Sequence, residues 1–61
     1  MKRYIEVGDR ILLNDKAPKW TNFLIFTVKD VLAWRVLCYT RIDGARKYYE
    51  AHEEEIQKVL S

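Results

Sequence analysis

The sequence predicts a mainly all-β domain with five short strands and a single helical turn near the C-terminus. Runs rich in β-branched and aromatic residues recur between short clusters of turn-forming residues. An Asp-Gly pair at positions 43 and 44 separates two of these runs, which is typical of a two-residue β-hairpin. Because 49% of the residues are hydrophobic and glycine and proline are scarce, the composition indicates a folded domain rather than a disordered chain.

The first strand is expected at residues 10–13, after a Gly-Asp turn signal at positions 8 and 9. Alternation along this strand directs Ile11 and Leu13 to the core, while Leu12 points outward or lies under a loop. Residues 14–22 follow as the longest loop, because they contain the only proline and several turn formers.

The second strand is expected at residues 23–32 from its density of Phe, Ile, Thr and Val. If Phe26 and Val28 face the core, Val31 can also face it only if one extra residue intervenes. The pattern therefore predicts a β-bulge at positions 29 and 30 that bends the strand. Residues 33–35 would then form a tight connection into the next strand.

Residues 34–51 are expected to form the hairpin around which the rest of the fold is organised. The two-residue turn fixes which residues lie opposite one another. The expected pairs are Ile42 with Ala45, Arg41 with Arg46, Thr40 with Lys47, Tyr39 with Tyr48, Cys38 with Tyr49, Leu37 with Glu50 and Val36 with Ala51. One face is largely apolar and is expected in the core; it consists of Trp34, Val36, Cys38, Tyr49 and Ala51. The other face is charged and aromatic, with Leu37 among Arg35, Tyr39, Arg41, Arg46, Tyr48 and Glu50.

Two interpretations compete for the residues after position 51. His52, Ile56, Val59 and Leu60 recur at helical spacing, which would give a helix of about two turns packed on the sheet. The alternative is a single turn over residues 52–56 followed by a last short strand at residues 58–60. We favour the second interpretation, because four strands with an open edge need a fifth to close them.

The length of 61 residues indicates one domain, residues 1–61, at the small end of what folds without a disulfide or a metal. Cys38 is the only cysteine, which excludes an internal disulfide and fits a reducing, cytoplasmic compartment. The amino terminus lacks the apolar run of a signal peptide. Charged residues interrupt the apolar stretch at residues 23–39 too often for a membrane-spanning helix, so we expect no membrane association.

No residues form a convincing catalytic, metal or cofactor site. Cys38 has the parity of the core face, where a cysteine behaves as a small hydrophobic residue. His52 is followed by three glutamates, but adjacent side chains on one turn diverge and would make a poor metal site. The sequence has no glycine-rich phosphate loop. We therefore expect a non-catalytic protein without a cofactor.

The order of these features resembles the small Src-homology-3-like barrels of bacterial and phage proteins. The residues that carry the resemblance are Val-Gly-Asp-Arg-Ile at positions 7–11, the Asp-Gly hairpin tip, and Tyr-Tyr-Glu-Ala-His-Glu-Glu-Glu-Ile-Gln-Lys-Val at positions 48–59. The resemblance is one of layout and covers residues 7–60. It implies a five-stranded barrel with one helical turn before the last strand, in a group whose members mostly bind proteins or nucleic acids. Because the sequence starts at a Met and has almost no tail, we expect a free-standing small protein. Fold alone does not fix function.

The plasmid-borne type II dihydrofolate reductases share this layout and resemble the chain in length and at the Gly-Asp-Arg of positions 8–10. Their active-site run is Val-Gln-Ile-Tyr. The matching residues here are Arg46, Lys47, Tyr48 and Tyr49, so the glutamine and the isoleucine of that run are missing.

The charged and aromatic hairpin face is the best candidate for function. We expect it to bind a larger protein partner, because Trp, Tyr and Arg dominate the energetics of interfaces. The residues expected to contact that partner are Trp20, Arg35, Tyr39, Arg41, Arg46 and Tyr48. Trp20, in a polar loop, would either anchor the partner or fold back as a lid over the mouth of the barrel.

Two other interpretations of this face remain open. Nucleic acid could bind through Arg35, Arg41 and Arg46, with the tyrosines stacking on bases, although the formal charge of +2 permits a basic patch without requiring one. The face could also be an ordinary solvated surface, since paired tyrosines and arginines are common on exposed sheets. A free strand edge would in addition allow homodimerisation.

Overall fold

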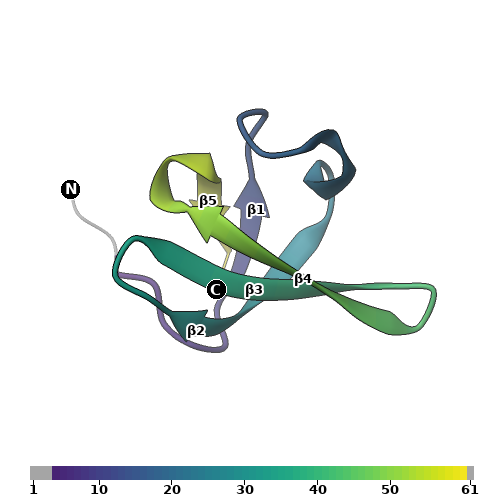
Figure 1. Ribbon diagram of the computed structural model, residues 1–61, viewed down its shortest axis with the longest axis horizontal. Coiled ribbons are helices and arrows are strands. Elements are labelled where there is room, and N and C mark those ends of the chain that lie inside the picture. The colour runs from purple at the N-terminus through teal and green to yellow at the C-terminus, as the bar shows by residue number, and fades with distance from the viewer. Residues whose placement is uncertain (1–3, 61) are drawn as a thin grey trace.

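The computed structural model describes residues 4–60 and is mainly β. Five antiparallel strands form one sheet in the order β4-β3-β2-β1-β5 (Figure 1). The elements are β1 (Arg10–Leu13), the 3-10 turn η1 (Lys19–Thr21), β2 (Ile25–Val31), β3 (Arg35–Ile42), β4 (Ala45–His52), the 3-10 turn η2 (Glu53–Glu55) and β5 (Ile56–Val59). None of the helical segments within residues 4–60 has the length and apolar character needed to cross a membrane.

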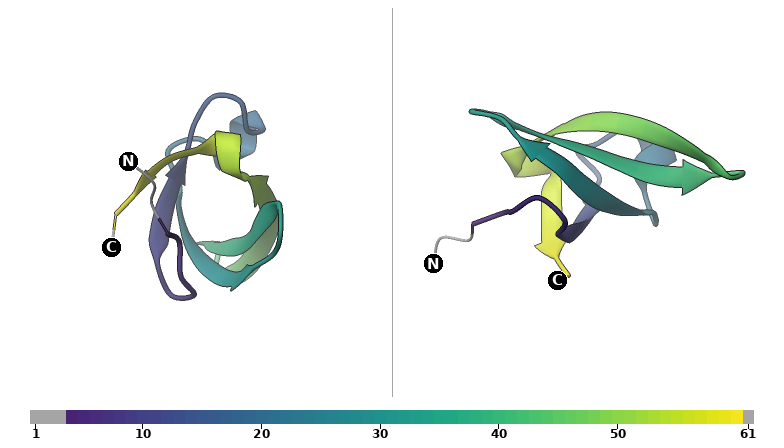
Figure 2. Two further views of the ribbon diagram at one scale, coloured as in Figure 1. Left: turned by 90° about the vertical axis from the view of Figure 1, so that its left-hand side faces the viewer. Right: turned by 90° about the horizontal axis from the view of Figure 1, so that it is seen from below.

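The sheet is strongly curled, so that β1 and β5 lie across from β3 and β4 (Figure 2). Its two edge strands are β4 and β5, which η2 joins directly in the sequence. Within residues 4–60 no strand pairing connects these two edges, and the sheet is not closed there. The far end of the β3–β4 hairpin projects beyond the rest of the molecule (Figure 1).

The core lies on the concave side of the sheet. It contains the residues that alternation in the first two strands directs inward. The side chains of Ile11, Leu13, Phe26 and Val28 are buried, and β1 has the expected bounds. The strand β2 is shorter at both ends than the predicted 23–32. The buried hydrophobic residues are Ile11, Leu13, Ala17, Phe26, Val28, Val36, Cys38 and Ala51.

The bulge predicted in the second strand is confirmed. The register between β2 and β3 shifts after Val28, so that Val28 lies opposite Cys38 but Asp30 lies opposite Leu37. The Asp30 side chain accepts a hydrogen bond from the Val31 N–H at 2.9 Å. The predicted burial of Val31 is wrong, because this residue is the last in the strand and lies where the core ends, with 45% of its surface exposed.

The predicted register of the β3–β4 hairpin is confirmed at all seven pairs, and Arg35 opposite His52 extends it by one. Asp43 and Gly44 have φ of +53° and +81°, as a mirror-image turn requires. One assignment to the core is wrong. Trp34 is 81% exposed, because β3 begins only at the next residue and Trp34 lies in the turn between β2 and β3.

The chain ends in a turn followed by a strand, as the favoured interpretation predicts, and not in a helix. The Glu55 carboxylate fixes this turn by accepting hydrogen bonds from the His52 N–H at 2.9 Å and from the Tyr49 hydroxyl at 3.0 Å. The strand β5 starts two residues earlier than predicted and pairs with β1.

Candidate functional site

The outer face of the β3–β4 hairpin contains a cluster of three predicted partner-contact residues. Tyr39 lies directly opposite Tyr48, with 5.7 Å between the ring centroids. The Arg46 guanidinium carbon lies 4.2 Å from the centroid of the Tyr39 ring, and Arg46 Nη1 donates a hydrogen bond to the Tyr48 hydroxyl at 3.4 Å. These contacts hold the exposed side chains in one arrangement, which lowers the entropy lost when they bind.

Arg46 also changes the electrostatics of this cluster. Its hydrogen bond to the Tyr48 hydroxyl lowers the pKa of Tyr48, and the positive charges of Arg46 and Lys29 add to that effect. The same hydrogen bond raises the pKa of Arg46. The face therefore presents a fixed positive charge between two aromatic rings.

The three arginines of this face do not form one patch. Arg35 lies at the opposite end of the hairpin from the other two, where its Nη1 forms a salt bridge with Glu50 Oε1 at 2.8 Å. Arg41 lies directly across from Arg46 near the hairpin tip. Arg41 and Arg46 therefore place two positive charges near the tip, beside Asp43 in the turn.

Trp20 does not share a face with Tyr39 and Tyr48. The turn η1 places its indole against the core side, edge-on to Phe26 at 6.0 Å and to Tyr49 at 5.9 Å between centroids. Lys47, which alternates with Arg46 along β4, has its Nζ 4.9 Å from the centroid of the same indole. Trp20 is 38% exposed and packs on the fold from the inner side.

The residue that sequence analysis missed is Phe23. It follows η1, where the chain reverses within three residues to enter β2, and its φ is +67°. Its side chain is 100% exposed. A bulky residue with positive φ is an outlier among folded proteins, and such outliers cluster at functional sites. Alternation identifies Ile25 as outward, because its parity is opposite to that of Phe26, but it does not apply to Phe23, which precedes β2.

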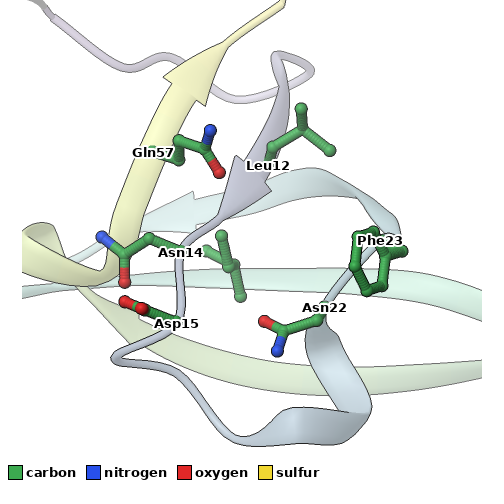
Figure 3. A pocket seen from close by; sticks show the side chains of 7 residues that line it. Leu12, Asn14, Asp15, Asn22, Phe23 and Gln57 are labelled. Atoms are coloured by element: carbon green, nitrogen blue, oxygen red, sulfur yellow. The ribbon is translucent and has the colours of Figure 1, made fainter.

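Phe23 borders a hollow of about 380 Å³ on the outer face (Figure 3). Leu12 and Ile25, paired across β1 and β2, both point to this face, and Ile25 is 47% exposed. The hollow has an apolar floor and amide and carboxylate groups at its rim. Its lining residues are Leu12, Leu13, Asn14, Asp15, Asn22, Phe23 and Gln57.

A second hollow, of about 470 Å³, joins Phe23 to the tyrosine cluster. Phe23, Ile25, Tyr39 and Arg41 all line it. One continuous surface thus runs across the outer face of four strands, and we call it the Phe23 surface. Its members are Leu12, Phe23, Ile25, Tyr39, Arg41, Arg46 and Tyr48. It contains four of the six predicted partner-contact residues and omits Trp20 and Arg35.

The groups considered for catalysis lie elsewhere. Burial raises the pKa of the Cys38 thiol to about 11, with a smaller contribution from Glu55, and its Sγ donates a hydrogen bond to the Tyr49 carbonyl at 3.2 Å. Cys38 is therefore protonated at neutral pH and packs as part of the core. Residues 4–60 contain no group of three or more His, Cys, Asp or Glu side chains placed to hold a metal ion.

Trp34 belongs to a separate apolar groove at the β2–β3 turn. This groove has a volume of about 340 Å³ and is lined in part by Val31, Leu32 and Val36. It lies at the opposite end of β3 from the Tyr39 cluster, so it is distinct from the Phe23 surface.

Comparison of the chain with protein-family models, with curated proteins and with solved structures finds no match.

Proposed function

We propose that this chain is a non-catalytic binding module, a small Src-homology-3-like barrel of bacterial or phage type, which binds and modulates a larger protein through the Phe23 surface. The observation that carries the proposal is Phe23 itself, fully exposed and held at a positive φ. The proposal keeps the expected class of partner but moves the centre of the contact surface from the hairpin face to Phe23, and it leaves out Trp20 and Arg35.

The strand layout supports the barrel part of the proposal. The chain has five strands and a 3-10 turn directly before the last strand, which is the layout expected for such barrels, and in the sheet β1 lies between β2 and β5. The curl of the sheet brings its two halves face to face (Figure 2). The seam between β4 and β5 is the point at which it departs from a closed barrel.

Phe23 destabilises the monomer through its backbone, and its exposed side chain contributes nothing to folding. A left-handed backbone costs a non-glycine residue roughly 1–2 kcal/mol. Leaving a phenylalanine side chain in water forgoes about 1.5–3 kcal/mol of burial free energy. A partner that covers the ring recovers the second amount, so binding provides a physical reason for a residue that folding alone disfavours.

The surroundings of Phe23 have the composition of a protein interface. Leu12 and Ile25 give an apolar centre, and the tyrosines and arginines of the cluster lie beside it. Interface cores are enriched in aromatic residues and arginine, and a few such residues dominate the affinity.

Photo-crosslinking tests the proposal. A benzophenone analogue of phenylalanine is introduced at position 23, or at position 34 as a matched exposed aromatic control, and each protein is irradiated in an extract of its native host. We expect a discrete protein adduct from position 23 and none of the same mass from position 34. The proposal fails if position 23 gives no protein adduct, or if both positions give the same adducts.

Nucleic-acid binding is the second candidate, favoured by one observation. Arg41 and Arg46 lie near the projecting hairpin tip on the outer face, with Tyr39 and Tyr48 beside them, and Lys47 follows on the inner face. Binding through three phosphate contacts would make the logarithm of the affinity fall with the logarithm of the salt concentration with a slope of about −2 to −3. A titration with single-stranded and double-stranded oligonucleotides at several salt concentrations measures this slope, and a flat response removes the candidate.

A further inference from the structure

The strand β4 is an unusually long edge for so small a sheet. It has eight residues, against four in the other edge strand, β5. On one side it pairs with β3 along its whole length, and within residues 4–60 no strand pairs with its other side. Natural sheets usually shorten, cover or charge such edges, because an open edge is a template for another strand.

Hairpin geometry identifies the backbone groups that point away from β3. A two-residue turn makes Ile42 and Ala45 a hydrogen-bonded pair, and the pattern then alternates along the ladder. The N–H and C=O groups of Lys47 and Tyr49 therefore point to β3. The groups of the alternate residues, Arg46, Tyr48 and Glu50, point to the open side. His52 has the same parity, and its N–H donates away from the sheet to Glu55.

The charged side chains that could block this edge are held elsewhere. Lys47 lies over the Trp20 indole on the inner face, and Arg46 lies over the Tyr39 ring on the outer face. Glu50 forms its salt bridge back toward β3, with Arg35. The backbone groups between Arg46 and Glu50 are therefore accessible to another strand.

The charges along β4 suit a second copy of the same strand. β4 is positive near its start, at Arg46 and Lys47, and negative near its end, at Glu50. Antiparallel pairing about a two-fold axis at Tyr48 places Arg46 of each copy opposite Glu50 of the other, so opposite charges lie across from one another twice, in addition to the Arg35–Glu50 salt bridge within each copy. A parallel pairing in register would instead place like charges side by side.

We propose that two copies of this chain associate through their β4 strands, antiparallel and centred on Tyr48, to form one sheet that continues across both molecules. The contact is self-complementary, so it closes after two copies and does not propagate. It leaves the side chains of Phe23 and Ile25 free on each copy. The inference does not depend on the proposed function, because it rests on the backbone edge and the charges of β4, but it shares Arg46 and Tyr48 with the Phe23 surface.

Charge reversal tests the pairing and its register. Sedimentation equilibrium over a concentration series up to about 1 mM covers the affinities of small interfaces. We expect the wild-type chain to dimerise. Arg46→Glu and Glu50→Lys should each weaken dimerisation about tenfold, because each places like charges opposite one another twice. The double variant Arg46→Glu with Glu50→Lys should recover most of the loss.

Two results overturn the proposal: a wild-type chain that remains monomeric over the whole series, or single variants that dimerise as well as the wild type. Loss in both single variants without recovery in the double variant overturns the register. Thermal melts of each variant establish that it is folded.

Hydrogen exchange of the wild-type chain tests whether the β4 edges pair, even if a variant unfolds. The amides of Arg46, Tyr48 and Glu50 should exchange at least about tenfold more slowly in concentrated than in dilute solution. The amides of Lys47 and Tyr49, bonded to β3, are the internal control and should show no such change. Equal exchange of the first three amides at both concentrations excludes edge pairing.

Discussion

Trp20 and Phe23 lie three residues apart in one connection between β1 and β2, yet the fold treats them in opposite ways. Trp20 lies within η1, and its indole packs edge-on against Phe26 and Tyr49. Phe23 follows the same turn with a positive φ, and its side chain is fully exposed. One aromatic residue stabilises the inner face of the sheet, and the other destabilises the monomer on the outer face.

The exposure of an aromatic residue therefore has to be judged together with its backbone conformation. Trp34 is also exposed, but φ in its turn is not positive and the residue carries no such conformational penalty. Phe23 combines exposure with a backbone conformation that glycine or asparagine would adopt more easily. This combination, more than hydrophobicity, separates a candidate contact residue from an ordinary surface residue.

Replacing Trp20 gives the largest expected effect on stability. Trp20→Ala removes the edge-on contacts with Phe26 and Tyr49, and we expect the free energy of unfolding to fall by about 2–3 kcal/mol, below the usual range for buried aromatic residues because Trp20 is partly exposed. The melting temperature should fall by roughly 10 °C or more. Thermal and urea unfolding measure the change. A loss below about 0.5 kcal/mol would show that the indole does not support the core.

Replacing Phe23 should have the opposite sign. Asparagine tolerates a positive φ better than phenylalanine does, and the substitution removes no buried surface because the Phe23 side chain is fully exposed. We therefore expect the free energy of unfolding to rise by up to about 1 kcal/mol. Urea unfolding measures the gain. Asp43→Asn is the matched control, since Asp43 already suits its positive φ, and should change stability by less than about 0.5 kcal/mol. A clear loss of stability in Phe23→Asn would contradict the strain assigned to this residue.

Ionisation of Tyr49 should also make the folded protein less stable at high pH. Burial, followed by the hydrogen bond to Glu55, raises the pKa of Tyr49 to about 12 from an ordinary value near 10. The folded state therefore holds this proton more tightly than the unfolded state. The stabilisation is complete below pH 10 and is lost as the pH rises toward 12. Because solvent near the Tyr49 hydroxyl screens its charge, we expect this loss in the free energy of unfolding to be smaller than that of Trp20→Ala.

Ultraviolet absorbance during a titration checks this assignment. The Tyr48 hydroxyl should ionise before that of Tyr49, because the hydrogen bond from Arg46 lowers the pKa of Tyr48. Tyr49→Phe should remove the last ionisation and flatten the loss of stability above pH 10. An unchanged profile in Tyr49→Phe would assign the transition to another group.

The smallest effect is expected at the second tryptophan. Trp34→Ala removes a side chain that is 81% exposed, and we expect the free energy of unfolding to change by less than about 0.5 kcal/mol. Unfolding followed by circular dichroism measures this change, in parallel with that of Trp20→Ala. A loss as large as that of Trp20→Ala would show that the two tryptophans do not differ as the fold indicates.

Most of the sheet could be predicted because the sequence patterns that determine its turns and register are local. The residues at positions 43 and 44 accept positive φ, so they fix the turn and with it every pair of the hairpin. A break in alternation located the bulge beside Asp30 in the same way. The turn before β5 was favoured from the need to cover an open edge.

The two tryptophans and Phe23 could not be placed because their positions depend on where elements end. Parity assigned Trp34 to the core, but parity holds only inside a strand, and β3 begins one residue later. Strand propensity put Phe23 into β2, but η1 ends so close to it that the chain must first reverse. Which side of the sheet η1 approaches, and so where Trp20 packs, is set by the tertiary fold.

Partner affinity of Phe23→Asn, measured beside its stability, tests most directly whether Phe23 is kept exposed for a partner. The crosslinked protein is purified, and its binding to the wild-type chain, to Phe23→Asn and to Trp34→Ala is measured by titration calorimetry. We predict that Phe23→Asn is at least as stable as the wild type and binds at least about 30-fold more weakly, the loss typical of an interface hot spot, while Trp34→Ala binds normally. Wild-type affinity in Phe23→Asn would show that the partner does not bind the Phe23 ring.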